Sequence, residues 1–483
     1  MIKHIPATPV TLPKMIFVFL AIMFISGCAP YRGRISGSPV GVPPSYSMTA
    51  PAYSAPAGRW WEQFGDDTLN RLTEEAFRYN LDIAQAYERL MQSRAIVNIT
   101  DASRWPVLNI EGAGGKTRQS GLYGMTTSDT FSLSAAASYE IDLWGKLSSR
   151  TDAARLDAIA SEESLKALFI SISAQIADLY FLAAEQQAQL ALSDETIASF
   201  KDTLDMVESR YRGGLVPAVD VYQSRQNLAS ARAQRPVFES NLAVTRNALA
   251  VMTGRFPDRK TGENFGNLTA APSFGAGLPS QLLTDRPDLK SGLLRLRAAD
   301  SRVAAAVADR FPSFSLVGRY GGASDEVRSV LDSPNILWNV LLQAVQPVID
   351  SGRRKAEVAR SESVVREYLA SYHKTVITAF QEVEDALSRI SASEQRLRML
   401  DETVSASESS LRLSLDRYMQ GLTDYLPVLT EQLRHFNAKS SLLAAKRQLI
   451  SDQIQLARAL GGDWSDQVME QYMKYKNTGE NTK

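Results

Sequence analysis

The chain has 483 residues, and its 53 Lys and Arg residues are balanced by 53 Asp and Glu residues, so the formal net charge is zero. This balance predicts no nucleic-acid partner. The single cysteine, Cys28, excludes an intramolecular disulfide. With only three histidines, the sequence shows no Cys/His cluster with the spacing of a metal site.

The first 28 residues are typical of a secretory leader. Lys3 and Lys14 provide positive charge ahead of an apolar run over residues 15–25. A helix of this length falls far short of the roughly 30 Å of hydrocarbon in a bilayer, but it suits the apolar region of a signal peptide. The run ends in Ile-Ser-Gly-Cys at residues 25–28, which resembles a bacterial lipoprotein box.

This box predicts cleavage after residue 27 and lipidation of Cys28 on its thiol and its new amino group. Several acyl chains make a stable anchor, and this covalent lipid is the only non-protein group that we expect, with no cofactor. Ala29, and not Asp, follows the cysteine, which by analogy with lipoprotein sorting indicates the outer membrane of a Gram-negative bacterium. Residues 28–58 are rich in Pro, Ser, Gly and Tyr and predict an extended tether.

The rest of the chain is an internal duplication with a spacing of about 207 residues, far longer than a solenoid repeat. We expect a first repeat over 59–255, a linker over 256–280, a second repeat over 281–464 and a tail over 465–483. The matched segments are 104–106 with 310–312, 142–146 with 350–354, and 210–215 with 417–422.

Two strands are predicted in each repeat, at about 107–116 and 130–143 in the first and 313–322 and 336–348 in the second. The second of these strands alternates between apolar and mostly Ser-rich positions, as a tilted membrane strand with one lipid-facing side does. The polar residues 117–129 predict a loop. Four strands are too few to close a barrel, and an open sheet edge is not tolerated in lipid, so we expect an obligate oligomer.

A very long helix follows the strands of each repeat. Neither Pro nor Gly occurs over residues 152–211 or over 354–418. Apolar residues there recur at steps of three and four, which is typical of coiled-coil packing. Mainly α structure with a few membrane strands is therefore the predicted fold class.

Six short motifs follow one another along the duplicated frame. They are WWEQFGD at 60–66, YEIDLWGK at 139–146, TGR at 253–255, RPDL at 286–289, DSGRR at 350–354 and EVEDA at 382–386. In this order they resemble the motifs of the outer membrane factors, the TolC-like and OprM-like exit ducts of efflux and type I secretion systems. The lipoprotein box places the chain nearer to the OprM-like, NodT-type lipoproteins than to TolC itself.

The resemblance implies a TolC-like duplicated fold. Four strands from each protomer of a homotrimer would close a twelve-stranded β-barrel in the outer membrane, and the long helices would form a periplasmic α-barrel. The implied function is the exit duct of a tripartite efflux system for small molecules such as drugs or metals. Its partners would be a periplasmic adaptor (membrane fusion) protein, an inner-membrane efflux pump and outer-membrane lipid.

The resemblance also implies a gate at the periplasmic tip, where the two repeated turns lie. Polar links that hold this tip shut in relatives map onto Asp220 and Tyr418, and a carboxylate–hydroxyl bond contributes about 1 kcal/mol. The adaptor would contact the turns themselves. The residues expected there are Arg210, Gly213, Gly214, Leu215, Arg417, Gly421 and Leu422.

The second turn departs from the family pattern. Pro427 and Thr430 stand where relatives of one or both branches carry acids, which leaves Asp424 and Glu431 as candidates for an acidic ring. Leu426 matches an apolar constriction position of the OprM-like branch. We therefore expect packing at Leu426, more than charge, to close the gate, with Thr430 beside it.

Three other functions have less support in the sequence. Catalysis has little support, because His373 and His435 stand alone and Gly115-Lys116-Thr117 lacks the earlier glycine of a phosphate-binding loop. A coiled-coil periplasmic lipoprotein without a pore explains the helices but not the strands. A type I secretion duct for proteins remains an alternative, although the lipoprotein box and the OprM-like turns favour small-molecule export.

Overall fold

The computed structural model describes residues 35, 37–47, 58–121, 124–257, 265–266, 268, 272–277 and 279–480. The predicted leader, Cys28 and much of the predicted tether lie outside the described residues. The first repeat contains η1 (Trp60–Phe64), α2 (Asp67–Tyr79), α3 (Leu81–Ala102), β1 (Val107–Gly121), β2 (Gly124–Ile141), α4 (Lys146–Arg212) and α5 (Ala218–Met252). The second contains η2 (Pro279–Gln281), α6 (Leu282–Asp285), α7 (Pro287–Ala308), β3 (Ser313–Ser324), η3 (Val327–Ser329), η4 (Ser333–Asn335), β4 (Ile336–Val345), α8 (Arg353–Met419), α9 (Tyr425–Leu460) and α10 (Trp464–Glu480).

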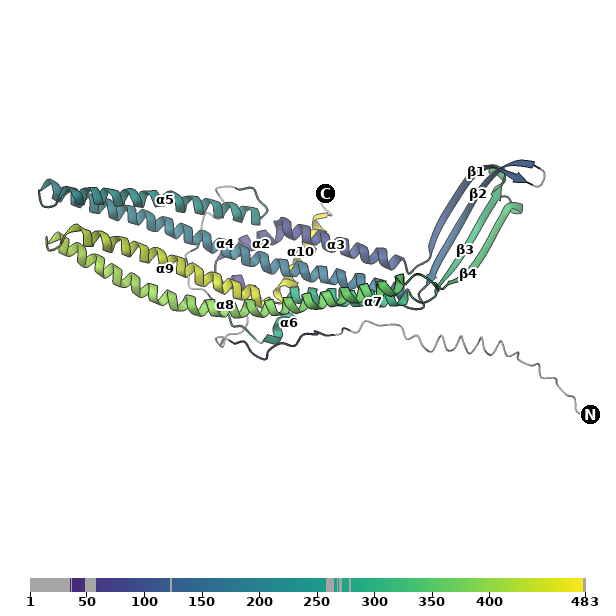
Figure 1. Cartoon of the computed structure of the whole chain (residues 1–483). Helices are drawn as coiled ribbons and strands as arrows, with labels where there is room; N and C mark the ends of the chain where they lie inside the picture. Colours follow the sequence, from purple (N-terminus) through teal and green to yellow (C-terminus); the bar gives the residue numbers. More distant parts are fainter. Residues whose placement is uncertain are drawn as a thin grey trace, which may run out of the picture. The chain divides into compact units, whose positions relative to one another are not determined.

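The helices repeat closely in length between the two halves of the chain, whereas β1 and β2 are longer than β3 and β4 (Figure 1). Helices α3 and α7 each have 22 residues, and α4 and α8 each have 67. At about 1.5 Å per residue, each of the two long helices measures about 100 Å. The duplicated fold with two very long helices is therefore confirmed.

The described chain divides into two compact units. The sheet unit consists of Ser93–Ala158 and Leu294–Ala370 with the described residues up to Pro39, and it holds all four strands. The helical unit consists of Val40–Gln92, Ile159–Leu293 and the described part of Ser371–Lys483.

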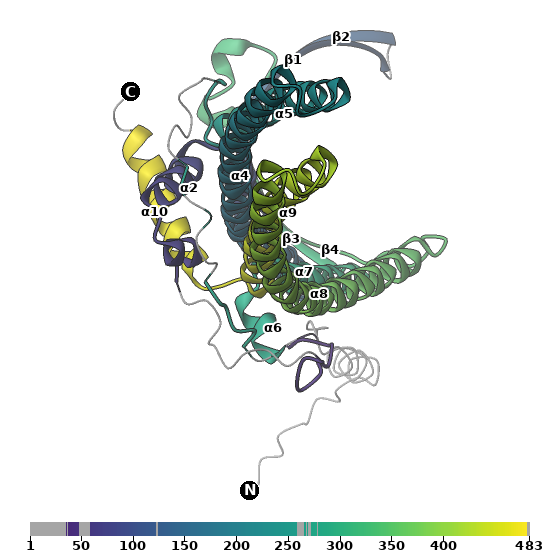
Figure 2. The same cartoon turned by 90° about the vertical axis from the view of Figure 1, so that its left-hand side faces the viewer.

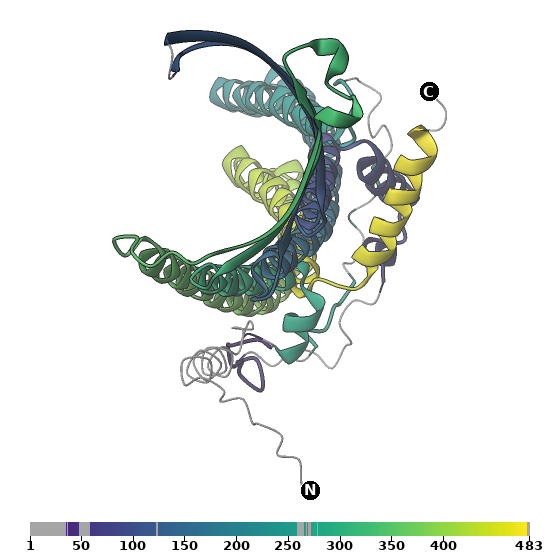
Figure 3. The same cartoon turned by 90° about the vertical axis from the view of Figure 1, so that its right-hand side faces the viewer.

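The four strands form one antiparallel sheet in the order β1-β2-β3-β4, and Figure 3 shows that this sheet is curved. The predicted loop over residues 117–129 is wrong. Strand β1 runs on to Gly121 and β2 begins at Gly124, with each residue of 115–121 paired across the ribbon. Thr is a good strand former, and the polar cross-strand partners Lys116 and Asp129 also form an ion pair of 3.3 Å.

Strand β4 ends earlier than predicted, at Val345 and not at residue 348. Its last pair in the ladder is Ser313 with Val345. Pro347, two residues later, has no N–H to donate, so the ladder cannot continue through it.

The register places the apolar series of all four strands on the same face, as the alternation predicts. Side chains directly opposite each other point to one side of a sheet, so the pairs of Ile110 with Ala135, Ala135 with Tyr320, and Tyr320 with Trp338 define one row. We call this side the apolar face. Its larger members are Leu108, Ile110, Phe131, Leu133, Tyr139, Ile141, Phe314, Leu316, Tyr320, Trp338, Val340 and Leu342.

The opposite side, the polar face, carries most of the polar strand residues. Val317, Leu337 and Leu341 are apolar residues on the same face. Glu111 and Arg319 reach across β2 to form an ion pair of 2.7 Å there. The remaining polar members are Asn109, Ser132, Ser134, Ser138, Glu140, Ser315, Asn339 and Gln343.

Each long helix begins at a turn that an aspartate caps. Asp142 accepts hydrogen bonds from the amides of Leu147 and Ser148 at 3.0 and 2.7 Å. Burial alone would raise the pKa of Asp142, but the hydrogen bonds from Ser148 and Leu147 outweigh it and lower this pKa. Asp350 plays the same part before α8, where it accepts a bond of 3.2 Å from the amide of Arg354.

Aromatic side chains of η1, α2, α4 and α10 form part of the core of the helical unit. Trp61 and Trp464 are buried and meet edge to face with their ring centroids 4.7 Å apart. Burying such a side chain contributes roughly 1.5–3 kcal/mol. Much of the predicted tail is therefore a packed helix, and Figure 2 shows α10 beside α2 on the outer side of α4.

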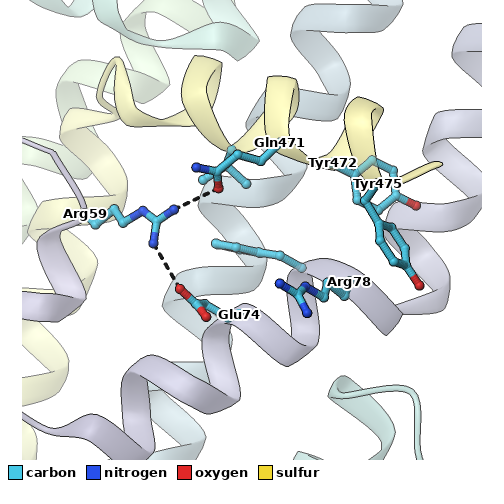
Figure 4. Close-up of a pocket in the computed structure, with 8 residues that line it drawn as sticks. Arg59, Glu74, Arg78, Gln471, Tyr472 and Tyr475 are labelled. Carbon is cyan, nitrogen blue, oxygen red and sulfur yellow. Dashed lines mark hydrogen bonds and ion pairs between the residues drawn. The ribbon is translucent and has the colours of Figure 1, made fainter. Parts of the chain in front are cut away.

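Polar contacts hold α10 to α2 around a pocket of about 200 Å³ (Figure 4). Arg59 pairs with Glu74 at 3.1 Å and donates to Gln471 at 2.9 Å. Arg78, Tyr472 and Tyr475 line the other end of the pocket. These contacts around the pocket hold the C-terminal helix on the outer surface of the helical unit, away from the helix tips.

Among the described residues, one helix is long and apolar enough to cross a membrane by length and composition alone. It is α4, and most of its apolar window is buried within the protein. Burial of this kind is typical of a core helix.

Candidate gate at the helix tips

The two tip turns have the same backbone structure. Leu215 donates its amide to the carbonyl of Arg210, and Leu422 donates to Arg417, both at 2.9 Å. Gly214 and Gly421 lie at φ 73° and 72°, a conformation that costs little for a residue without Cβ. Each turn is therefore a Schellman motif, which ends the long helix.

A small apolar cluster, the tip cluster, joins the two hairpins. Figure 2 looks onto this end, where α4 and α5 lie next to α9 and α8. The buried members are Val207 of α4, Val221 of α5, Tyr418 of α8, and Tyr425 and Val428 of α9. The rings of Tyr418 and Tyr425 lie 5.8 Å apart.

Arg210 ties the two turns together. Its guanidinium donates to the carbonyl of Met419 at 3.1 Å and lies 4.9 Å from the ring centre of Tyr418. Arg210 is half-buried by these contacts, whereas its repeat equivalent Arg417 is exposed. Of the two predicted adaptor-contact arginines, the structure thus leaves Arg417 at the surface and uses Arg210 within the chain.

Two polar atoms are buried in this region without a hydrogen-bond partner among the described residues. They are the hydroxyl of Tyr418 and Nε of Arg210, whereas the Tyr425 hydroxyl lies within hydrogen-bonding reach of Ser224 and Asn227. Each such group costs about 1–3 kcal/mol relative to a hydrated one. Hydration of these two groups therefore favours opening of the tip, against the apolar packing of the tip cluster.

The structure brings Asp220 near Tyr418 but does not join them. Within the described chain no hydrogen bond forms between the two side chains, and the Tyr418 hydroxyl is left without a partner. Burial, and then the charge of Asp220, raise the pKa of Tyr418. The Asp220–Tyr418 hydrogen bond implied by the family resemblance is thus absent within one chain.

Asp220 and Asp424 form an acidic pair at the starts of α5 and α9. Asp220 lies in the first turn of α5, and Asp424 precedes α9 without capping it through its side chain. Burial raises the pKa of Asp220 above its usual 3.8, and the charge of Asp424 raises it further. The pair is repulsive when both carboxyls are ionised.

The remaining predicted gate residues follow along α9. The Leu426 side chain is 60% exposed, so it packs little within its own chain. The Thr430 hydroxyl donates to the Leu426 carbonyl at 2.9 Å. Glu431 pairs with Arg434 at 2.9 Å. This ion pair offsets the charge of Glu431, which makes Glu431 a poorer candidate for an acidic ring.

The predicted turn residues Gly213, Gly214, Leu215, Gly421 and Leu422 are all exposed. Sequence reasoning missed the buried members Val207, Val221, Tyr425 and Val428. One signal was available, because Val221 and Val428 occupy equivalent places after the two turns.

Comparison with known proteins decides the family. The model of the outer membrane efflux protein family matches residues 72–255 and 278–462, one match for each repeat. The chain belongs to the outer membrane efflux protein family. It is therefore an outer-membrane efflux channel, and its family consists of transport channels and not of enzymes.

Individual relatives agree over nearly the whole length. The solvent efflux pump outer membrane protein SrpC of Pseudomonas putida is 31% identical over 84% of this chain and 87% of its own. The cation efflux system protein CusC of Escherichia coli is 30% identical over 84% and 88%. The probable outer membrane lipoprotein SilC of Salmonella typhimurium is 28% identical over 92% and 97%.

Solved structures show the same fold. The outer-membrane channel OprN matches with a TM-score of 0.83 at 26% identity, covering 91% of this chain and 99% of that one. A structure of CusC matches with a TM-score of 0.78 at 26% identity, over 90% and 99%.

The acidic pair predicts that acid closes the channel. Because the packed tip raises the pKa of Asp220, it binds this proton more tightly than an opened, hydrated tip does. Protonation therefore favours the closed state, and current through planar bilayers should fall as the pH drops from neutral towards 4. Asp220→Asn should give the small current at pH 7 and remove the pH dependence, while Asp202→Asn on α4 serves as the matched control. A larger current in Asp220→Asn would show instead that this carboxylate holds the tip shut.

Tyr418→Phe tests whether the hydroxyl acts as a latch. It removes a buried hydroxyl that lacks a partner, so the closed tip should be unchanged or firmer by up to about 1 kcal/mol. Single-channel current should then equal that of the wild type or be smaller. Tyr211→Phe, at the exposed equivalent position of the first repeat, is the control. An enlarged current only in Tyr418→Phe would establish the latch.

Proposed function

We propose that the protein works as a homotrimeric exit duct of a tripartite efflux system, which passes small molecules from an inner-membrane pump to the cell exterior. The observation that carries this proposal is the four-stranded sheet with one apolar face and two unpaired edges, β1 and β4. In hydrocarbon each unpaired backbone group costs several kcal/mol, so strands of other copies must pair with these edges.

The number of copies follows from the space inside a barrel. Two copies would give eight strands, and the interior of an eight-stranded barrel is just wide enough to be filled by side chains. Three copies give twelve strands and leave room for a duct. In that barrel the apolar face meets lipid and the polar face, with Glu111 and Arg319, lines the lumen.

We propose that the tip closes this duct. The packing that joins the two hairpins is small, and it buries the Tyr418 hydroxyl and Nε of Arg210 without partners. A gate of this kind is closed at rest and opens at modest cost. Leu426 has few contacts in its own chain, so it is available to pack against its copies around the three-fold axis.

The exposed tips are the proposed contact for the periplasmic adaptor. Leu215, Val219, Tyr222 and Leu422 each expose more than half of the side chain, which is a large apolar surface for the end of a helical hairpin. Lipidation at Cys28 is proposed to anchor the mature chain, and SilC, one relative, is named as a probable lipoprotein. The pump is proposed to select the cargo, since the relatives' names span solvents and cations.

Trimer closure has a direct test. The protein extracted in mild detergent should run as a trimer in unheated gels, change its mobility on heating, and conduct in planar bilayers. Gly321→Val should prevent assembly, because a Cβ at Gly321 would lie 2.3 Å from the Leu133 carbonyl oxygen and break the β2–β3 pairing. Gly115→Val in the same sheet meets no atom within 4 Å and should leave the trimer intact. If the wild-type protein folded but stayed monomeric and carried no current, the proposal would be wrong.

Packing at Leu426 is tested by truncation. Leu426→Ala should raise single-channel conductance, because it removes an apolar side chain from the proposed constriction without loss of a contact inside the chain. Leu413→Ala, at a similarly exposed leucine of α8, should leave the conductance unchanged. Equal conductance in wild type and Leu426→Ala would place the constriction elsewhere.

A further inference from the structure

The β1–β2 ribbon extends beyond the rest of the sheet. Pairing between β2 and β3 ends at Phe131 with Ser324, whereas β1 and β2 continue to pair as far as Gly121 with Gly124. In Figures 1 and 3 this dark-blue ribbon runs on past the green ends of β3 and β4. The function of an efflux duct does not explain this extension.

The length of the β2–β3 ladder matches the apolar band of an outer-membrane barrel. Eleven pairs join β2 to β3, from Phe131 to Ile141. At about 3.4 Å per residue and a tilt of about 45°, they span about 24 Å of height, close to the roughly 25 Å band of such barrels. The ribbon therefore begins where the hydrocarbon ends.

The ribbon carries its cations on the same side as the apolar face. Period-2 alternation continues the series of Leu108 and Ile110 through Gly112 and Gly114 to Lys116 and Arg118. The two cations lie two and four residues past the level of Phe131, which is about 5 and about 10 Å beyond the band. That layer holds lipid headgroups.

The charge of this surface is positive. Lys116 pairs with Asp129 at 3.3 Å, and both are well exposed, so the pair is weak. Among the described residues, no acid lies within ion-pair distance of Arg118. Lys116, Arg118 and Asp129 are the charged members of the ribbon, and they leave it with one net positive charge.

We propose that Lys116 and Arg118 bind a phosphate group of an anionic outer-leaflet glycolipid, with its acyl chains against the apolar face. This proposal rests on the proposed function, which puts the helices in the periplasm and the ribbon on the outer side. The outer leaflet of a Gram-negative outer membrane consists mainly of phosphorylated glycolipid, so charge and position match one occupant.

The test is binding of lipid A to the full-length protein in detergent, measured by native mass spectrometry. The probe is lipid A with both phosphates, compared with enzymatically dephosphorylated lipid A and with inorganic phosphate. A basic residue near an anionic lipid surface is worth about a fivefold change in affinity, so Lys116→Gln/Arg118→Gln should weaken binding of lipid A about thirtyfold. Asp129→Asn should tighten it up to about fivefold.

The control is Arg366→Gln/Lys374→Gln, which removes two exposed cations of α8 and should bind lipid A as the wild type does. Equal affinity of the ribbon variant and the wild type would overturn the proposal, as would equal affinity for dephosphorylated lipid A or competition by inorganic phosphate alone. The ribbon variant should keep its bilayer conductance. If neither the wild type nor the ribbon variant conducted, the result would count against the exit duct and not against this lipid site.

Discussion

A peptide group that is left unpaired in hydrocarbon costs several kcal/mol, and the rest of this structure depends on that cost. Strands β1 and β4 each present a row of such groups, and the sheet has one apolar side. Only closure with other copies satisfies both the edges and the apolar face. In the proposed trimer the polar side is turned inward, and a water-filled lumen follows from satisfying the backbone.

The same need to pair backbone groups explains why the strands and the helices assemble in different ways. A helix satisfies its own backbone and needs no closure, so the long helices are free to be assembled through side chains alone. Asp142 and Asp350 mark the change from strand to helix, and each caps the amides at which a long helix begins. Strand thus gives way to helix at equivalent points of the two repeats.

Local chemistry made much of the fold predictable. The absence of Pro and Gly located both 67-residue helices, and Gly214 and Gly421 located the turns that end them. The β1–β2 ribbon was missed because its residues are polar and its stability comes from pairing across the hairpin. Much of the tail was missed as a helix because Trp464 packs on Trp61, about four hundred residues away in sequence.

The candidate site was predictable to a smaller extent. Resemblance placed Asp220, Tyr418 and Leu426 at one end of the helices, where the structure also puts them. It could not give the side-chain partners, because these depend on packing between residues about two hundred positions apart. Tyr418 packs on Tyr425 and under Arg210, and its hydroxyl does not reach Asp220 in one chain.

The two repeats diverge in sequence at the tip, and this divergence supplies the residues of the proposed gate. Tyr211 and Tyr418 hold the same place in identical Schellman motifs, yet the first is exposed and the second is buried. Pro427 stands at the second-repeat position that matches Asp220, and Asp424 at the one that matches Pro217. Asp220 and Asp424 therefore come from different repeats and from non-equivalent positions, and the charge of Asp424 acts on Asp220. Charge repulsion between repeats opposes apolar packing between repeats, and a balance of that kind can be shifted by a proton or by a partner at the tip.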